Sequence, residues 1–583
     1  MENVILQCAL YLLLLAVLAW PLGAYMSKVM DKEPLGLLSF LVPCEHALYR
    51  IMGVNPTEQM SWKRYLACLL AFSAVSTAIL MLLLMVQHIL PLNPQGIPDT
   101  SWHLALNTAV SFVTNTNWQA YSGESAMSYL AQMAGLTVQN FASAAVGISV
   151  LFALIRGLRA SGTAALGNFW ADVTRATLYI LLPFSLVLSL LLVWQGVPQN
   201  FSDYKTVALL EPISTEDGTT VTEQMVPMGP QASQVAPKQL GTNGGGYNGV
   251  NSAHPHENPT PLSNMLEMLG LLLIPAGLCF TFGQKIGDMR QGIAVFAAMF
   301  LLLTISVSFT VWAEQEATPQ LVQNGLINLT QQGGYVAPSG GNMEGKEARF
   351  GIVNSAIWAA ATTAASNGSV NAMHDSFTPI GGLVPMVLMQ LGEVVYGGVG
   401  SGLYGMLAFV LLTVFLAGLM VGRTPEYLGK KVEPFEMKMA VVVCLVTPVT
   451  ILIGSGIMCL APQVVGNLNN PLPHGFSEIL YAATSAGANN GSAFAGLNAN
   501  TPFLNVLLSL LMLASRFVPI AAILAVAESM TRKKNVAASS GTLSTSNGIF
   551  IFLLVFVVLL VGALSFFPAL ALGPVAEHLQ MAR

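Results

Sequence analysis

Four short clusters of Thr, Ser, Asn and Gly recur along the chain, and none of them contains a charged residue. A ring of carbonyl and amide oxygens can replace the water around a weakly hydrated monovalent ion, which favours potassium. Glycine lets the backbone turn its carbonyls inward. A Ca²⁺ or Mg²⁺ site would be expected to present carboxylates instead. The clusters lie at 114–117, 242–245, 363–368 and 485–491.

The spacing of the clusters indicates an internal repeat. Asn115, Asn243, Asn367 and Asn490, taken as equivalent positions, follow one another at intervals of 128, 124 and 123 residues. Nearly equal spacing of one chemical type is typical of a repeated structural unit. The competing interpretation is that the clusters are only Asn- and Gly-rich turns, and the regular spacing favours a pore lining over it.

Each cluster follows a half-apolar segment that is too short to cross a membrane. Non-helical backbone at membrane depth is tolerated only where it is buried in protein or lines a water-filled cavity. We therefore expect four re-entrant loops around one axis, with short helices aiming their partially negative C-termini at the ion. The segments lie at about 101–113, 228–240, 348–361 and 474–483.

The composition places these loops in a membrane protein. Of the 583 residues, 54% are hydrophobic and only 9% are charged, which is too apolar for a soluble globular protein. A crossing helix needs about 20 apolar residues. Ten stretches have that length, at about 4–24, 65–90, 127–155, 172–195, 262–283, 291–313, 383–422, 439–461, 503–529 and 548–572. The first stretch lacks a basic n-region and a clear cleavage site, so we expect it to be retained.

The predicted fold is all-α and polytopic: ten transmembrane helices with four fused membrane-pore-membrane repeats in a pseudo-fourfold arrangement. The predicted division is a first transmembrane helix with a cytoplasmic segment (1–64), four pore repeats (65–160, 161–288, 289–430 and 431–535) and a last transmembrane helix (536–583). The two longest polar segments, at about 196–240 and 314–350, are interpreted as surface loops.

The distribution of basic residues predicts the orientation. When ten spans are threaded, 17 of the 23 Lys and Arg residues fall on one side and five on the other. The positive-inside rule makes the first side cytoplasmic, so both termini and all four loops should be extracytoplasmic. Acids in excess on the outside, such as Asp203, Glu211 and Glu344, would concentrate cations near the entrance.

A glycine-rich run interrupts the seventh stretch. Gly400, Gly402 and Gly405 spell the GxGxxG pattern of dinucleotide-binding sites, but the pattern does not follow a strand. The run at 396–405, which also contains Gly397 and Gly398, is better interpreted as a helix break below the filter that could act as a gate. A simple packing kink is the alternative.

Arg516 is the most notable charged residue inside a predicted span, because it lies near the middle of the stretch at 503–529. Burial of arginine in hydrocarbon is costly, so such residues usually face a cavity or a partner. Below the filter, its positive charge would oppose free passage of potassium toward the cytoplasm and would suit diversion of the ion sideways to a pump subunit. The alternative is a salt bridge to Glu528 or Glu393.

Other candidate motifs give weaker signals. A near match to the P-loop at 340–346 is followed by Glu347 rather than Ser or Thr and lies outside, so we attribute it to chance. His254, His256 and Glu257 are interrupted and bracketed by prolines, which favours a hydrogen-bonded turn over a metal site. His374 and Asp375 are interpreted as polar residues that fix the third loop. The six cysteines show no metal-ligand spacing.

Six sequence strings resemble the potassium-binding subunit of the Kdp-type potassium-transporting ATPase, and the resemblance covers nearly the whole chain. That family belongs with potassium channels and symporters built from fused membrane-pore-membrane repeats. The strings are TNTNWQAYSGE (114–124), GTNGGGYN (241–248), NSAHPHENPTPLSN (251–264), NAMHDSFTPIGG (371–382), GRTPEYLGKK (422–431) and NNGSAFAGL (489–497).

The resemblance implies that the chain binds extracytoplasmic potassium selectively and passes it to a P-type ATPase catalytic subunit for ATP-driven, high-affinity import. Small accessory membrane subunits would complete the complex in the bacterial cytoplasmic (inner) membrane. Potassium is the only cofactor or metal expected, and this non-hydrolytic chain would bind no nucleotide and no nucleic acid. The resemblance also implies an intramembrane barrier below the filter.

Transferred position by position, the filter of that family falls on Asn115, Thr116, Asn117, Thr242, Asn243, Gly244, Ser366, Asn367, Gly368, Asn490 and Gly491. The family pattern can have Cys where this chain has Asn367, so whether the Asn367 side chain coordinates the ion stays open. Backbone oxygens would survive such a change.

Two alternative functions are weighed against ATP-driven import. The first is a stand-alone potassium channel or ion-coupled symporter, which would need no ATPase partner. The second is an intramembrane enzyme using His374, Asp375 and Glu393, although their spacing forms no nucleophile and base pair.

Overall fold

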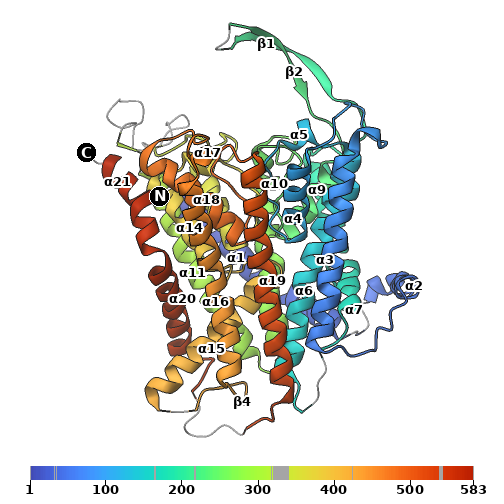
Figure 1. The fold of residues 1–583 in the computed structure, drawn as a ribbon, viewed down its shortest axis with the longest axis vertical. Helices are drawn as coiled ribbons and strands as arrows, with labels where there is room; N and C mark the ends of the chain where they lie inside the picture. The colour runs from blue at the N-terminus through green and yellow to red at the C-terminus, as the bar shows by residue number, and fades with distance from the viewer. Residues whose placement is uncertain are drawn as a thin grey trace.

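The structure is a computed structural model that describes residues 2–31, 33, 36–162, 166–215, 218–316, 318–319, 340–422, 424–536 and 543–581. Within these residues, ten helices are long and apolar enough to cross a membrane, which confirms the predicted all-α fold and its ten spans. They stand nearly parallel in one block (Figure 1). In hydrocarbon only a helix satisfies the backbone of a single crossing segment, so apolar stretches of this length fold as helices.

Polar residues fix where several spans begin. The side chains of Thr260, Thr501 and Asn547 accept hydrogen bonds from the first turns of α10, α19 and α20, and such caps pair amide groups that a helix leaves free. The spans are α1 (Glu2–Met30), α3 (Trp62–Met85), α6 (Val138–Arg159, after a π-helical turn at Ala131–Thr137), α7 with α8 (Phe169–Arg175 and Leu182–Gln195), α10 (Pro261–Ile286), α11 (Met289–Gln315), α15 (Ser401–Val421), α16 (Pro434–Leu460), α19 (Pro502–Arg532) and α20 with α21 (Gly548–Leu570 and Ala576–Met581).

Four shorter helices lie between successive spans: α4 (Trp102–Val113), α9 (Ala232–Leu240), α13 (Gly351–Ala364) and α18 (Leu472–Gly487). We call them the pore helices. The span that follows each pore helix is the more buried member of its pair. The buried share of the apolar stretch is 83%, 78%, 67% and 67% around α6, α10, α15 and α19, against 22%, 39%, 44% and 44% around α3, α8, α11 and α16. The second spans therefore form the inside of the molecule.

The seventh predicted stretch is not one continuous helix. It begins as α14 (Pro379–Gln390), loses helical structure over 391–400 and resumes as α15. Glu393 and Tyr396 have positive φ angles in this segment, and Gly400 starts α15 with a φ of 93°. The glycine-rich run thus separates two helices, which is a full break and not a packing kink.

The outer polar segments differ from the predicted surface loops. Residues Lys205–Ser214 (β1) and Thr220–Val226 (β2) pair as an antiparallel hairpin that projects from one end of the helix block (Figure 1). Thr and Val occur in both strands and suit a strand, a signal that the loop interpretation overlooked. Of the second segment, residues 317 and 320–339 lie outside the described residues. The smaller elements are α2 (Val42–Met52), α5 (Gly123–Ala126), α17 (Pro462–Val465), β3 (Glu426–Tyr427) and β4 (Lys430–Lys431).

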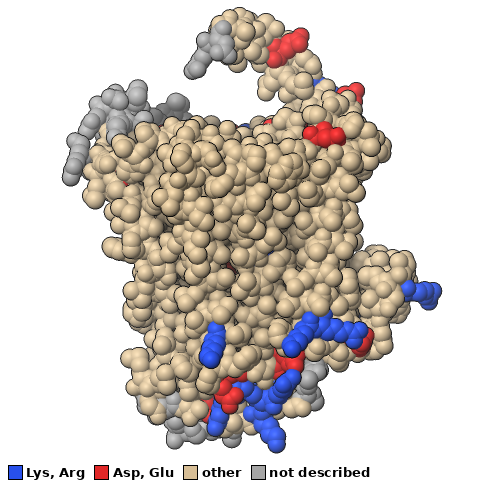
Figure 2. All heavy atoms as spheres, in the orientation of Figure 1, with Lys and Arg blue, Asp and Glu red and all other residues tan. Residues whose placement is uncertain are grey.

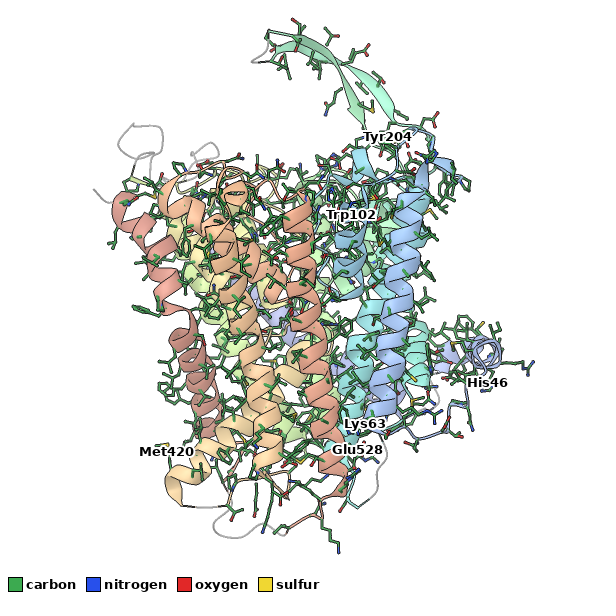
Figure 3. All side chains as sticks on the ribbon, viewed as in Figure 1. His46, Lys63, Trp102, Tyr204, Met420 and Glu528 are labelled. Carbon is green, nitrogen blue, oxygen red and sulfur yellow. The ribbon has the colours of Figure 1, made fainter. Side chains whose placement is uncertain are left out.

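The charged surface matches a membrane protein. On the face shown in Figure 2, Lys and Arg gather at the end opposite the hairpin, and a broad belt without visible charge crosses the middle. Lys63 and Glu528 lie at the basic end, while Trp102 and Tyr204 lie toward the hairpin (Figure 3). The chain is a multi-pass membrane protein, and on this face most of its visible charges lie toward the two ends of the helix block.

Candidate ion-binding site

The four pore helices end in the same backbone geometry. Beyond each helix, one N–H donates to the carbonyl five residues earlier, at 2.9 Å in all four cases. The donors are Thr116, Asn243, Asn367 and Asn490, and the acceptors are Ser111, Lys238, Thr362 and Ser485. The residue before each donor has a positive φ angle. These residues are Asn115 (65°), Thr242 (51°), Ser366 (52°) and Asn489 (54°). One loop conformation is therefore built four times from different sequences.

This geometry defines four equivalent triplets, which we call the filter triplets: 115–117, 242–244, 366–368 and 489–491. It corrects the predicted register in the first loop, because Thr116 and not Asn115 is equivalent to Asn243. It also adds Asn489, which the sequence prediction left out. If each filter segment is taken to have three residues, counting back from Gly491 makes Asn489 the first residue of the fourth segment.

The filter triplets are joined into a closed ring. Each triplet is hydrogen-bonded to the loop before it and to the loop after it. The structure therefore brings the predicted residues of all four loops together at one place. The bonds are Asn115 Nδ2 to Thr242 O (3.0 Å), Asn243 Nδ2 to Asn115 Oδ1 (2.7 Å), Gly368 N to Asn243 O (3.1 Å), Ser366 Oγ to Ala488 O (2.8 Å) and Asn489 Nδ2 to Thr116 Oγ1 (2.9 Å).

Glycine at the third position allows the loops to touch backbone to backbone. A Cβ atom on Gly244 would lie 2.1 Å from the amide nitrogen of Gly368, and one on Gly491 would lie 2.0 Å from the carbonyl oxygen of Thr116. Both glycines also have φ angles near 95°, namely 95° and 97°, which L side chains rarely adopt. No larger residue fits at either position without displacing a neighbouring triplet.

The amide side chains at the second position point into protein. Asn367 donates from Nδ2 to Lys238 O (3.1 Å), and its Oδ1 accepts from Ser369 N (2.7 Å). Asn490 repeats this pattern with Thr362 O (3.3 Å) and Ser492 N (3.0 Å). These side chains fix the loops, so any oxygen that these two residues offer to an ion is the backbone carbonyl.

Several filter carbonyls remain available. Within the described residues, the carbonyl oxygens of Thr116, Ser366, Gly368 and Asn490 accept no hydrogen bond, although these four residues are buried. A buried carbonyl without a partner is costly. A dehydrated monovalent cation would supply the missing interaction.

A buried ammonium supports the second triplet, and sequence reasoning missed it. Lys238 is fully buried in α9 and forms an ion pair with Glu257. Its Nζ also donates to Asn251 Oδ1 (2.6 Å), and Asn251 Nδ2 donates to Gly244 O (2.6 Å). Glu257 is thus occupied, and the 254–258 segment serves as a structural turn. A lysine in the half-apolar segment before the second loop, with Glu257 in the segment after the loop, was the available signal.

Two other predicted polar residues have separate partners. His374 Nδ1 lies 2.8 Å from the hydroxyl of Tyr481, and burial together with the charge of Lys346 lowers the pKa of His374 to about 3. His374 is therefore neutral at ordinary pH. Asp375 instead contacts His474 on α18, so the structure does not bring the two side chains to one reaction centre.

The ring separates two cavities. On one side a cavity of about 690 Å³ is lined by Asn117, Gly368 and Gly491 of the filter triplets, with Trp118 and Phe494. On the other side a cavity of about 30 Å³ is lined by Asn489, Glu393 and Arg516, among others. A space of roughly 10–15 Å³ holds one water molecule, so the inner cavity can take an ion or about two to three waters.

Arg516 lies on α19 and is 4% exposed. It has no ion pair among the described residues, so the structure does not show the alternative salt bridge. Glu528 pairs with Arg532 and accepts from Trp62 N (2.7 Å). Glu393 lines the same inner cavity and interacts electrostatically with the guanidinium, without a direct ion pair. A guanidinium with no direct ion-pair partner among the described residues thus lies under the ring.

The helix break touches the filter from the same side. Val399 N donates to Thr242 Oγ1 at 2.9 Å, and a Cβ atom on Gly400 would lie 2.2 Å from Gly147 O in α6. Gly397 and Gly398 lie beside this contact in the buried break, and Gly402 lies in the first turn of α15. The predicted gate residues are therefore placed directly beneath the second triplet.

Comparison with known proteins identifies relatives along the whole chain. A family model described as "Potassium-transporting ATPase A subunit" matches residues 9–579. Chains named "Potassium-transporting ATPase potassium-binding subunit" are 76% identical in Desulfovibrio desulfuricans (100% of both chains) and 64% identical in Clostridium perfringens (100% of both chains). The crystal structure of the potassium transporter TrkH from Vibrio parahaemolyticus matches with a TM-score of 0.51 at 14% identity, covering 88% of this chain and 96% of that one. The last likeness concerns the fold alone.

Proposed function

The chain belongs to the potassium-transporting ATPase A subunit family, and we propose from this membership that it binds potassium and passes it to a P-type ATPase subunit for ATP-driven import. The observation that carries the proposal is the closed ring of four filter triplets, with unpaired carbonyl oxygens at Thr116, Ser366, Gly368 and Asn490. Neutral oxygens held by a rigid backbone suit a monovalent cation and give no carboxylate for Ca²⁺ or Mg²⁺.

Three features support delivery to a partner over free conduction. The helix break at 391–400 lies against the second triplet through Val399 and Thr242. The inner cavity is small, and Arg516 lines it without an ion pair among the described residues. A positive charge in a confined, poorly solvated space raises the energy of a cation there. An ion that leaves the filter then needs a side route, which the ATPase subunit would provide.

The membrane placement is part of the same proposal. The chain would lie in the bacterial cytoplasmic membrane with its basic end inside, so that both termini, the hairpin and the 690 Å³ cavity face outward. The repeats would run over 65–160, 161–288, 289–430 and 431–535, each with one pore helix between two spans. Small accessory membrane subunits would complete the complex.

The test is to purify the tagged chain in mild detergent from its native membrane and to measure potassium-stimulated ATP hydrolysis. We expect stimulation by potassium but not by sodium, and loss of stimulation when the co-purifying large subunit is stripped away. A preparation with no partner and no ATPase activity that passes potassium in liposomes would instead support the stand-alone channel or symporter.

A further inference from the structure

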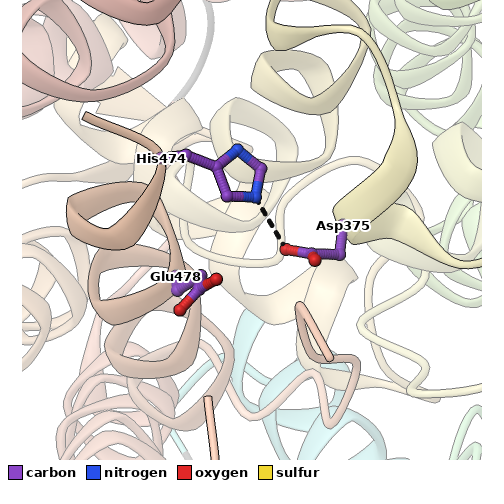
Figure 4. A group of neighbouring side chains, drawn as sticks. All are labelled: Asp375, His474 and Glu478. Atoms are coloured by element: carbon purple, nitrogen blue, oxygen red, sulfur yellow. Dashed lines mark hydrogen bonds and ion pairs between the residues drawn. The ribbon is translucent and has the colours of Figure 1, made fainter. Parts of the chain in front are cut away.

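A second polar site lies at the beginning of the fourth pore helix, outside the filter triplets. His474 and Glu478 are one helical turn apart on α18, and Asp375 comes from the segment that follows the third triplet. One ligand atom from each of the three residues lies within 4.8 Å of the other two. Figure 4 shows the His474 ring facing Asp375, with the Glu478 carboxylate beside them.

Two of the three ligand atoms are already close together. Asp375 Oδ1 lies 3.0 Å from His474 Nε2 in a hydrogen bond that a bound metal ion would replace. Around tetrahedral Zn²⁺, with bonds of about 2.0–2.1 Å, neighbouring ligand atoms are roughly 3.3 Å apart. The Glu478 oxygen lies within 4.8 Å of the other two ligand atoms and must approach them by at most about 1.5 Å, a movement that a glutamate side chain can make by rotation.

The second ring nitrogen of His474, Nδ1, also has a carboxylate partner. His474 Nδ1 lies 2.7 Å from Glu577 Oε1 on the C-terminal helix α21, and the imidazole stacks on Phe494 at 6.0 Å and 11°. Metal-bound histidines almost always donate their second ring N–H to a carboxylate or carbonyl, which fixes the tautomer and directs the free nitrogen to the metal. Glu577 occupies that place here.

Glu478 supplies an independent observation that points to a ligand at this site. It is 1% exposed, and its Oε1 accepts from Asn470 Nδ2 at 2.6 Å. Its Oε2 has no hydrogen-bond partner among the described residues. A buried carboxylate oxygen without a partner is expensive, and a cation between Glu478, Asp375 and His474 would satisfy it.

We propose that Asp375, His474 and Glu478 bind a transition-metal dication of the Zn²⁺ type, with Glu577 as a positioning residue. One imidazole nitrogen and two carboxylate oxygens suit Zn²⁺ better than Ca²⁺ or Mg²⁺, which prefer oxygen ligands alone. The side chains of His474 and Asp375 are 21% and 11% exposed, so the metal can reach them from solvent. Bound metal would tie the third-triplet segment to the fourth pore helix.

The experiment is a calorimetric Zn²⁺ titration of the chelator-treated protein with its co-purifying partners, at constant potassium. We expect one saturable equivalent, which Glu478→Gln and His474→Gln remove. Glu577→Gln should keep the equivalent but weaken its affinity about 10–100-fold, which a merely structural ion pair would not predict. His46→Gln is the matched control, because His46 is an exposed imidazole on the projecting helix α2 (Figure 3).

A second readout does not depend on any variant. Because a ligand that binds the folded state raises the unfolding temperature, Zn²⁺ should raise that temperature in the wild-type protein, and Mg²⁺ at the same concentration should not. The proposal is overturned if wild-type protein takes up no equivalent of Zn²⁺, or if well-folded His474→Gln and Glu478→Gln proteins titrate like the wild type. Potassium-stimulated ATP hydrolysis, measured separately, reports on the filter and not on this site.

Discussion

The backbone N–H of Val399 donates a 2.9 Å hydrogen bond to the hydroxyl of Thr242. Val399 belongs to the break between α14 and α15, and Thr242 is the first residue of the second filter triplet. The same threonine carbonyl accepts from Asn115 Nδ2 in the first triplet. The break and the ring are therefore joined directly at Thr242.

Thr242→Val tests this link. Valine keeps the β-branched shape but leaves the buried Val399 N–H without an acceptor, at a cost of about 1–3 kcal/mol. We expect a lower unfolding temperature and a larger passive potassium flux in proteoliposomes without ATP. Thr413→Val is the matched control, since the buried Thr413 hydroxyl on α15 has no hydrogen-bond partner among the described residues. Equal fluxes in the two variants would contradict the coupling.

Gly244→Asp should weaken discrimination of potassium from sodium, because a carboxylate would enter a neutral oxygen ring. Gly244→Ala separates charge from shape. Its Cβ atom alone meets Gly368 N at 2.1 Å, and strain of about 1–3 kcal/mol corresponds to roughly tenfold weaker potassium activation or more. The measurement is ATPase stimulation by potassium and by sodium. Unchanged selectivity in both variants would count against the filter assignment.

Arg516→Gln should open a leak. A unit charge several ångströms from the ion path opposes a cation by about 2 kcal/mol at an effective dielectric of 20, which corresponds to roughly a 30-fold change in passage. Passive potassium flux without ATP should rise accordingly. Arg532→Gln removes a guanidinium of the same helix at an exposed end and should leave the flux unchanged. An unchanged passive potassium flux in the Arg516→Gln protein would show that another part of the chain forms the barrier.

His374 gives a pH dependence with a defined sign. Burial, with the charge of Lys346, lowers its pKa to about 3, below the unfolded value of about 6.5. Its contribution to stability is complete above pH 6.5 and is lost as the pH falls from 6.5 toward 3. At pH 5 the loss amounts to about 2 kcal/mol.

The measurement is the unfolding temperature at pH 6.5 and pH 5 for the wild type and for His374→Gln. The variant should lose stability less steeply between these two values, because glutamine does not titrate. Parallel curves for the two proteins would mean that His374 accepts a proton in the folded state as readily as it does in the unfolded chain.

The sequence predicted the ten spans and the four loops because both depend on composition and spacing alone. An apolar stretch of about 20 residues has few alternatives to a helix in a membrane. The register of the first triplet was missed because Asn115 and Thr116 are both plausible loop residues, and only the backbone bond from Thr116 to Ser111 distinguishes them. The hairpin was missed because its strands are exposed on both faces, so they lack the alternation of apolar and polar residues that a half-buried strand shows.

Support behind the loops was harder to predict, because it comes from residues far apart in the sequence. Asn489 reaches Thr116 across 373 residues, and no local pattern reveals such a pair. In the sequence, Lys238 counted only as one of the five basic residues on the outer side. Its partner Glu257 lies on the other side of the second triplet, so no local pattern indicates the ion pair. Hydrogen-bond partners of this kind depend on how the repeats are assembled.

All four filter triplets belong to one polypeptide, and this decides how the site can vary. In a pore made of identical subunits, any substitution appears four times around the axis. Here the residues of each quadrant can change independently. The residue whose carbonyl accepts the repeated backbone hydrogen bond carries a hydroxyl in three of the pore helices (Ser111, Thr362 and Ser485) and an ammonium group in the second (Lys238). The ring therefore keeps a fourfold backbone geometry, while the side chains around it differ from one quadrant to the next.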